Sequence, residues 1–294
     1  MKKALIITFA VIVCLGGLTG FFIGAASRFA LFELFISLAP TAPLFPESNI
    51  LLLGVDDAFG QRSDTIMVLH VGPEKKEASV VSIPRDTLVV LPERGLDKIN
   101  HAFAYGGAEL SRRTVEELLH VQIPYYLTLN LAGIENLIDE IGGIEINVEK
   151  RMYYTDYSQD LYIDLKPGLQ KLSGKDTMGY LRFRHDDGDF ARIARQQKFL
   201  KALAAEMIKK DNILRSPGLF LSLLSYVDTN LNSRQVMGLC LGLRGAYELG
   251  QVYMTTIPGS DLMVDGIYYW KPDEPAIQRI VEQFILGKRL ASSG

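Results

Sequence analysis

The sequence predicts an α/β fold, in which a single layered domain with a central mixed β-sheet covered by helices follows one N-terminal transmembrane helix. Three observations lead to this expectation. Short aliphatic runs ended by Gly or Pro alternate with segments of helical spacing, which is typical of helices packed on a sheet. An uncharged run of 24 residues begins at Ala4. The chain has 294 residues, 48% of them hydrophobic, so it can bury a full core.

The expected strands are short β-branched or aliphatic runs whose composition favours burial. They cover residues 49–55, 65–71, 78–84, 125–130, 144–148 and 251–258. Helical spacing predicts helices over residues 108–120, 131–143, 189–210, about 213–226, 233–247 and about 273–286. The glycine pair at positions 142 and 143 is suited to a helix C-terminus. The chain has no internal repeat, so we expect one folded domain.

The N-terminal segment predicts the compartment. Residues 1–3 would form a short cytoplasmic tail and residues 4–27 the anchor, because 24 residues at about 1.5 Å each span a hydrocarbon core of roughly 30 Å. A cleaved signal peptide is the alternative, although its apolar core typically has only about 7–15 residues. Lys2 and Lys3 favour a cytoplasmic N-terminus. Either reading gives an extracytoplasmic domain, and the anchored form is a single-pass protein of the cell membrane.

A linker is expected over residues 28–48, since Pro40, Pro43 and Pro46 prevent a continuous helix there. Its apolar side chains would be costly in open water, so we expect this segment to lie along the bilayer or to pack on the domain. The extracytoplasmic domain then covers residues 49–294.

Composition argues against several classes of function. A net charge of −3 offers no general attraction for nucleic acid, so a basic site would have to be local. The two cysteines are not expected to pair, because Cys14 falls inside the predicted anchor. The four histidines lack the spacing of metal ligands. The segment LSGKDT does not complete a phosphate loop, because Leu169 stands where the first glycine is required.

Charged residues cluster at the ends of predicted strands and at the start of one helix. Arg62 and Asp64 come directly before a strand, and Arg85 follows another, at the strand end where layered α/β folds bind ligands. Any one of these residues could be an ordinary surface ion pair, which contributes little to stability. Four arginines within fourteen residues are harder to explain in that way and indicate an anion site: Arg182, Arg184, Arg192 and Arg195.

Seven segments, in order, resemble the LytR-CpsA-Psr family of cell-wall glycopolymer ligases. They are NILLLGVD, RSDTIMVL, VVSIPRDT, DKINHAFAYGG, LIDEIGGIEINV, LKPGLQKLSG and YLRFRHDDGDFARIARQQ, and the resemblance covers about residues 49–210. It implies a Mg²⁺-dependent phosphotransferase. Such an enzyme moves a polymer, for example teichoic acid or capsular polysaccharide, from a polyprenyl-pyrophosphate lipid onto peptidoglycan. The product is a phosphodiester at a muramic acid 6-hydroxyl.

The resemblance also implies roles for particular residues. Asp56 and Asp64 would hold Mg²⁺, with either Asp56 or the adjacent Asp57 facing the ion. Asp189 would assist removal of the proton from the acceptor hydroxyl, and Arg85 would act in catalysis as well as in binding. The pyrophosphate-binding set would be Arg62, Arg85, Arg182, Arg184, Arg192 and Gln196. Supporting or structural roles are expected for Asp86, Lys98 and Asn100.

Two other functions remain open at the level of sequence. A lipid-pyrophosphate phosphatase could use the same anion site with water as the acceptor. A membrane-tethered regulator of the cell envelope would need no chemistry at all. The apolar residues of the later helices could line a channel for the lipid tail or simply form the core.

Overall fold

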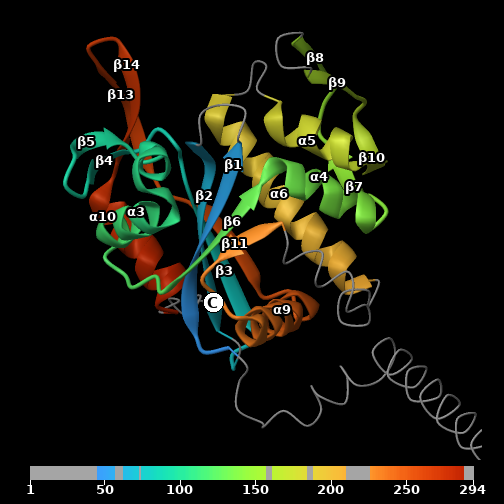
Figure 1. The fold of residues 1–294 in the computed structure, drawn as a ribbon, viewed down its shortest axis with the longest axis horizontal. Helices are drawn as coiled ribbons and strands as arrows, with labels where there is room; N and C mark the ends of the chain where they lie inside the picture. The colour runs from blue at the N-terminus through green and yellow to red at the C-terminus, as the bar shows by residue number, and fades with distance from the viewer. Residues whose placement is uncertain are drawn as a thin grey trace, which may run out of the picture.

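The computed structural model describes residues 45–56, 62–72, 74–156, 161–183, 188–209 and 226–287 (Figure 1). Its centre is a six-stranded sheet in the order β11-β6-β1-β2-β3-β12. β1 pairs with β6 and β3 pairs with β12 in parallel, and the other pairs are antiparallel, so the mixed sheet is confirmed. The strands are β1 (Ser48–Asp56), β2 (Arg62–Gly72), β3 (Glu77–Ile83), β6 (Tyr125–Asn130), β11 (Val227–Thr229) and β12 (Val252–Thr256).

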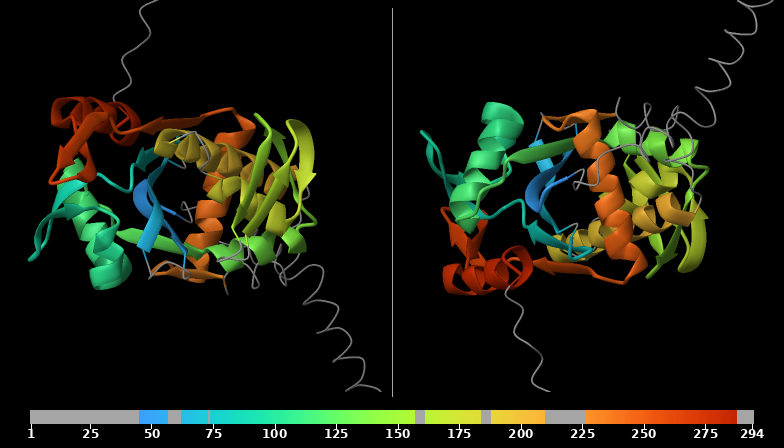
Figure 2. Two further views of the ribbon diagram at one scale, coloured as in Figure 1. Left: turned by 90° about the horizontal axis from the view of Figure 1, so that it is seen from above. Right: turned by 90° about the horizontal axis from the view of Figure 1, so that it is seen from below.

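Helices cover both faces of this sheet, as the views along it show (Figure 2). One face carries α3 (His101–Leu119), α10 (Glu274–Ile280) and the π-helix η2 (Val281–Ile285). The other face carries α6 (Gly188–Lys209) and α9 (Ser233–Glu248). Alternation along the strands supplies both cores, because successive side chains point to opposite faces.

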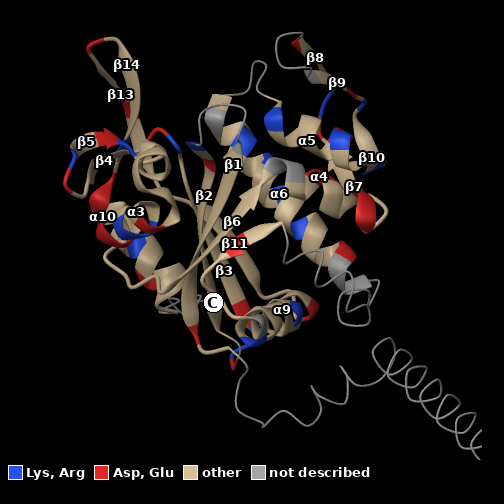
Figure 3. Ribbon diagram, in the orientation of Figure 1, with Lys and Arg blue, Asp and Glu red and all other residues tan. Residues whose placement is uncertain are grey.

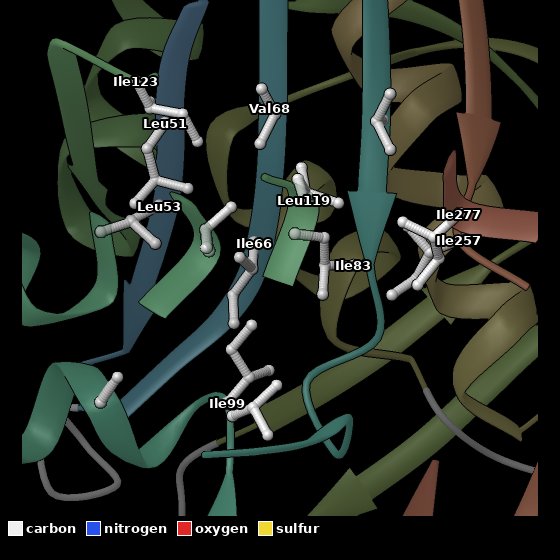
Figure 4. Packing of buried hydrophobic residues seen from close by; sticks show 14 of the residues in the cluster. Leu51, Leu53, Ile66, Val68, Ile83, Ile99, Leu119, Ile123, Ile257 and Ile277 are labelled. Carbon is white, nitrogen blue, oxygen red and sulfur yellow. The ribbon is translucent and has the colours of Figure 1, made fainter. Parts of the chain in front are cut away.

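The core beneath α3 shows this alternation directly (Figure 4). Leu51 of β1 and Val68 of β2 pack there with Leu119 of α3 and Ile277 of α10, and all four side chains are at most 1% exposed. Ile50, the neighbour of Leu51, instead packs on the opposite face with residues of α9. Segments from both ends of the described chain therefore meet in one core.

A further unit lies outside α6. It contains α4 (Leu131–Glu140), α5 (Gly174–Arg182), the pair β7 (Ile144–Val148) and β10 (Gly168–Leu172), and the pair β8 (Met152–Asp156) and β9 (Leu161–Leu165). These elements share a third apolar cluster with α6, in which Phe199 is 4% exposed. α6 therefore packs on the sheet on one side and on this unit on the other (Figure 2).

Three hairpins were not predicted from the sequence. β4 (Leu88–Leu91) pairs with β5 (Gly95–Lys98), β8 pairs with β9, and β13 (Gly259–Val264) pairs with β14 (Ile267–Pro272). The hairpin of β13 and β14 stands out from the body of the domain (Figure 1). Its strands are largely exposed, so they lack the buried aliphatic runs by which we identified the other strands.

Most predicted elements are present with shifted bounds. α3 begins at His101 rather than at residue 108, because a kink at Gly106 and Gly107 joins a short first helix to the predicted one. α4 ends at Glu140, and Gly142 and Gly143 follow with φ of 78° and 94°, values that glycine adopts readily. The helix expected over residues 213–226 lies, apart from its last residue, outside the described part of the chain.

Residues 1–44 also lie outside the described part, so the anchor and most of the linker stay predictions. Among the described residues, no helix is both long enough and apolar enough to cross a membrane. The described chain begins with Phe45, which is 1% exposed and packs beside Tyr125 with ring centroids 5.5 Å apart. The chain thus enters the core before the first strand begins.

Candidate active site

The segment RSD lies at the start of β2, opposite the end of β1. Asp56 is paired with Arg62 and Val55 with Ser63, but Gly54 is paired with Thr65, so Asp64 is an extra residue in β2. Such a bulge bends the strand and redirects the side chains around it. Arg62 is exposed, whereas the side chain of Asp64 is 26% exposed. Arg62 and Asp64 therefore have different surroundings although only one residue separates them.

The turn SIPRDT follows β3 at the same end of the sheet, and backbone hydrogen bonds fix its shape. Thr87 donates to the Pro84 carbonyl from both its backbone N, at 3.0 Å, and its Oγ1, at 2.6 Å. The Asn100 backbone N donates to the Arg85 carbonyl at 3.2 Å. The start of α3 therefore supports the turn that carries Arg85.

Arg85 lies between two carboxylates. Its NH1 donates to Asp64 Oδ1 at 2.7 Å, and its Nε lies 3.4 Å from Asp86 Oδ2. Lys98 Nζ donates to Asp86 Oδ1 at 2.7 Å. The four side chains are 12–26% exposed, so water screens these charges less than it would at the surface. The result is a chain of alternating charge that fixes the Arg85 guanidinium, and Figure 3 shows charged residues of both signs at this end of the sheet.

Gln196 brings α6 to the same place. Its Nε2 donates at 2.6 Å to Oγ1 of Thr65, the residue next to Asp64. Gly54 makes this contact possible, because a Cβ at that position would lie 2.9 Å from Cβ of Thr65. Arg192 lies one helical turn before Gln196 on the same side of α6 and is 2% exposed. The contact ties the arginine-rich helix to the strand that carries Asp64.

An aromatic contact holds the first turn of α6. The rings of Phe190 in α6 and Trp270 in β14 meet edge to face with centroids 4.7 Å apart. The Trp270 backbone N also donates to the Asp86 carbonyl at 2.8 Å. Trp270 therefore joins the turn after β3 to the helical turn that contains Asp189.

Arg182 is the last residue of α5. The helix continues through Arg182, and Phe183 after it is extended, with ψ of 126°. The LSGKDT segment is the start of this helix, where the Ser173 side chain accepts from the Asp176 backbone N at 3.1 Å. Its glycine serves packing, because a Cβ on Gly174 would lie 2.2 Å from the Glu135 carbonyl oxygen.

The structure therefore brings together Asp64, Arg85 and Gln196, since Arg85 contacts Asp64 and Gln196 contacts the adjacent Thr65. Arg62, Arg182 and Arg192 are placed on the elements described above. Asp57 and Arg184 lie outside the described part of the chain. The structure places Asp56 on β1 and Asp189 on α6 but does not describe their side chains. Sequence reasoning missed Thr65 and Trp270; Thr65 stands directly after RSD, but nothing in the sequence marked Trp270.

The carboxylates fit a magnesium ion only if a ligand completes the site. Within the ranges that the structure describes, no group of three or more His, Cys, Asp and Glu residues could hold a metal. Asp64 offers a carboxylate oxygen, and Asp56 stands on the adjacent strand end, opposite Arg62. Mg²⁺ prefers oxygen ligands and commonly uses one or two carboxylates together with phosphate and water. The donor set is therefore compatible with Mg²⁺ shared between these residues and a phosphate ligand.

These features define a class of protein, a layered α/β domain with an arginine and carboxylate site at the strand ends. Residues 46–285 match the LytR_cpsA_psr family, and the chain belongs to that family, as the motifs predicted.

Two relatives in sequence are informative. The polyisoprenyl-teichoic acid–peptidoglycan teichoic acid transferase TagU of Enterococcus faecalis is 32% identical over 243 residues, which cover 80% of this chain and 78% of TagU. Regulatory protein MsrR of Staphylococcus aureus is 39% identical over 204 residues, which cover 67% of this chain but only 61% of MsrR.

Solved structures agree with the fold. TagV of Bacillus subtilis superposes with a TM-score of 0.71 at 29% identity, over 82% of this chain and 97% of TagV. YwtF (TagT), whose structure contains octaprenyl pyrophosphate lipid, superposes with a TM-score of 0.64 at 25% identity, over 88% of this chain and 96% of that one. The layered α/β architecture with its mixed sheet is thus the architecture of these relatives.

Proposed function

We propose that the protein is a membrane-anchored transferase that moves a glycopolymer from a polyprenyl-pyrophosphate carrier onto peptidoglycan. The observation that carries this proposal is the position of the Arg85 guanidinium, whose NH1 lies 2.7 Å from Asp64 Oδ1. Gln196 of α6 contacts Thr65, the next residue of the same strand. TagU, named as a teichoic acid transferase, and YwtF (TagT), which binds octaprenyl pyrophosphate, support it. Because the chain and these relatives share a family, we assign the same class of substrate here.

The arginines would bind the pyrophosphate. A planar guanidinium can donate two parallel hydrogen bonds to phosphate oxygens, which a lysine cannot do. A charge-assisted hydrogen bond contributes about 1.5–3 kcal/mol, so a few arginines suffice to hold the group. We assign this role to Arg62, Arg85, Arg182, Arg184, Arg192 and Gln196.

The reaction that we propose exchanges one phosphorus–oxygen bond for another. The 6-hydroxyl oxygen of a muramic acid attacks the phosphorus that carries the glycan, and the bond to the lipid phosphate breaks. The products are a glycan joined to peptidoglycan through a phosphodiester and a polyprenyl phosphate. Asp189 would take the hydroxyl proton, while the arginines stabilise the charge on the leaving phosphate.

Asp56 and Asp64 would hold Mg²⁺, which would supply further positive charge at the pyrophosphate oxygens. Arg85 would then share Asp64 with the ion, so binding of the ligand should rearrange the contact between Arg85 and Asp64. Enzymatic phosphoryl transfer depends mainly on positioning the reactants and stabilising charge, and the arginines and aspartates assigned here would supply both.

We place the polyprenyl chain along the sheet face under α6 and α9. Several apolar side chains of that face are only partly buried, namely Leu52, Leu127, Leu200, Val236, Leu243 and Met254. Others, such as Met67 and Leu239, are fully part of the core. The two uses considered for these helices, a lipid site and a core, are therefore compatible. An anchor over residues 4–27 would place this domain outside the cell membrane, close to both substrates.

The direct test is a transfer assay with the full-length protein in detergent, a lipid-pyrophosphate glycan and isolated peptidoglycan. A transferase leaves polymer on the wall fraction and releases polyprenyl phosphate. A phosphatase releases glycan phosphate into solution instead. Arg85→Ala should abolish transfer, whereas Arg113→Ala, at an exposed position on α3, should leave it unchanged.

A non-enzymatic role in envelope regulation is the second candidate, because the relative MsrR is named a regulatory protein. Mass spectrometry of wall fragments from a deletion strain separates the two. A transferase requires Arg85, so a strain carrying Arg85→Ala should have the same wall defect as the deletion. If that variant restores the wall fully, the regulatory role is favoured.

A further inference from the structure

Arg195 belongs to the arginine-rich segment, but its contacts lie on the side of α6 that faces α5. Its side chain is 2% exposed, and a buried cation requires acceptors. The Arg195 NH2 donates to the Phe183 carbonyl, and its NH1 lies 3.6 Å from Glu149 Oε1. The Arg195 Cζ also lies 5.6 Å from the centre of the Phe183 ring. Two kinds of contact therefore join Arg195 to Phe183.

Glu149 connects this contact to the neighbouring elements. It follows β7, and its Oε2 accepts from Tyr180 of α5 at 3.0 Å and lies 3.5 Å from Lys198 Nζ of α6. Burial and the Glu149 charge raise the pKa of Tyr180, so its hydroxyl stays protonated and donates. The end of α5 is thereby attached to α6 through one carboxylate.

Phe183 is the residue that this network fixes. It separates Arg182 from Arg184, and its backbone N donates to the Gly179 carbonyl at 3.0 Å while its carbonyl accepts from Arg195. With both of its backbone groups bonded, the position of Phe183 at the end of α5 is fixed.

We propose that Arg195 is a positioning residue rather than a ligand of the pyrophosphate. By holding Phe183, the residue that follows α5, it keeps Arg182 at the end of α5 in place relative to Arg192 of α6, so that these two arginines reach one anion. The inference rests on the proposed function, since it assumes that these arginines bind pyrophosphate.

The test measures the Kd of the full-length protein in detergent for octaprenyl pyrophosphate. Arg195→Lys keeps the charge but lacks the planar fork that serves Phe183 and Glu149 together. Weakening one charge-assisted contact by about 1.4 kcal/mol corresponds to roughly a tenfold higher Kd. We expect this tenfold rise for Arg195→Lys in the otherwise native chain. When Arg182→Ala is also present, the same change should raise Kd less than about twofold, because the arginine that Arg195 would position is then absent.

Control variants keep the outcome interpretable. Arg113→Lys, on the exposed side of α3, should leave Kd unchanged. Tyr180→Phe removes only the hydroxyl that donates to Glu149, so it tests the network without touching a charge. It should raise Kd by about two- to fivefold, less than Arg195→Lys does, because Tyr180 contacts Glu149 and Arg195 still contacts Phe183.

Two results would overturn the assignment. An equal rise in Kd in both backgrounds would make Arg195 a direct ligand. A lower Tm with unchanged Kd, for both Arg195→Lys and Tyr180→Phe, would make the network purely structural. If the native chain itself does not bind octaprenyl pyrophosphate, the proposed function fails instead, so the two failures are distinguishable.

Discussion

Arg85 shows how a single side chain depends on its neighbours. Its guanidinium contacts Asp64 and Asp86, and Asp86 in turn contacts Lys98. Removing one member of such a chain leaves an opposite charge partly buried without its counterion, which is more costly than removing both. Asp86 and Lys98 therefore stabilise the turn only when both are present.

We expect Asp86→Asn to lower the free energy of unfolding by about 1–3 kcal/mol, because it leaves the Lys98 charge uncompensated. Adding Lys98→Met should recover part of this loss, so the two changes should be non-additive. Urea unfolding of the two single variants and the double variant measures the coupling. Strictly additive losses would show that the contact between Asp86 and Lys98 contributes nothing.

His70 makes stability depend on pH. It is 6% exposed, and its Nδ1 lies 2.9 Å from Oδ1 of Asn49, its partner across β1 and β2. Burial lowers the pKa of His70 below 6.5 despite the nearby Glu47. The unfolded chain therefore binds the proton first as pH falls, so stability is lost below a pH of about 6.5 and is retained above it.

Replacing His70 by Gln should remove this contribution. Urea unfolding at pH 5 and pH 8 should show a larger loss at the lower pH for the native chain than for His70→Gln. An equal loss in both proteins would mean that His70 does not titrate differently in the folded and unfolded states.

At the scale of elements, the bulge in β2 and the close approach of α6 depend on each other. Asp64 is the extra residue, Thr65 follows it, and Gln196 of α6 donates to Thr65. Gly54 on the paired strand leaves room for the Thr65 side chain. The absence of a side chain at Gly54 is therefore needed both for the pairing of β1 with β2 and for the contact of α6 with Thr65.

Gly54→Ala tests this dependence. The new methyl group would lie 2.9 Å from Cβ and 3.0 Å from Oγ1 of Thr65, so Thr65 must move away from Gln196. We expect a loss of about 1–3 kcal/mol in unfolding free energy, together with weaker binding of octaprenyl pyrophosphate. Gly72→Ala at the end of β2 is the control, since its nearest atom would be 3.6 Å away, an ordinary contact. Similar losses for both variants would contradict the proposed crowding.

For the whole molecule, α10 and η2 complete the core that β1 begins. Ile277, Val281 and Ile285 are at most 3% exposed and pack in the cluster that contains Leu51 and Leu53. Residues more than two hundred positions apart are therefore in one core, and we expect the described domain to unfold as one cooperative unit.

Ile277→Ala should lower the unfolding free energy by about 2–5 kcal/mol, as large-to-small changes in a packed core do. Ile267→Ala, at a position 49% exposed on β14, is the matched control and should change it by less than about 0.5 kcal/mol. Circular dichroism and the fluorescence of Trp270, the single tryptophan, should report the same transition. Separate transitions would contradict a single cooperative unit.

Prediction from the sequence succeeded where a signal is local. Buried aliphatic runs identified β1, β2 and β3, and helical spacing identified α6 and α9. It failed for β13 and β14, whose exposed strands carry no such run, and it placed the start of α3 after the glycines that only kink it. Exposed hairpins and kinks depend on tertiary contacts that no local pattern records.

The sequence by itself determined the alternation that builds a mixed sheet between helices and the set of arginines and aspartates that marks the family, because side-chain type and spacing are written in the chain. Only the tertiary structure decided which of these charges meet. Arg85 contacts Asp64 because β2 and β3 are paired and a bulge moves Asp64, and Arg195 turns to Phe183 because α5 packs beside α6. Such contacts depend on how distant segments pack, and sequence spacing does not contain that information.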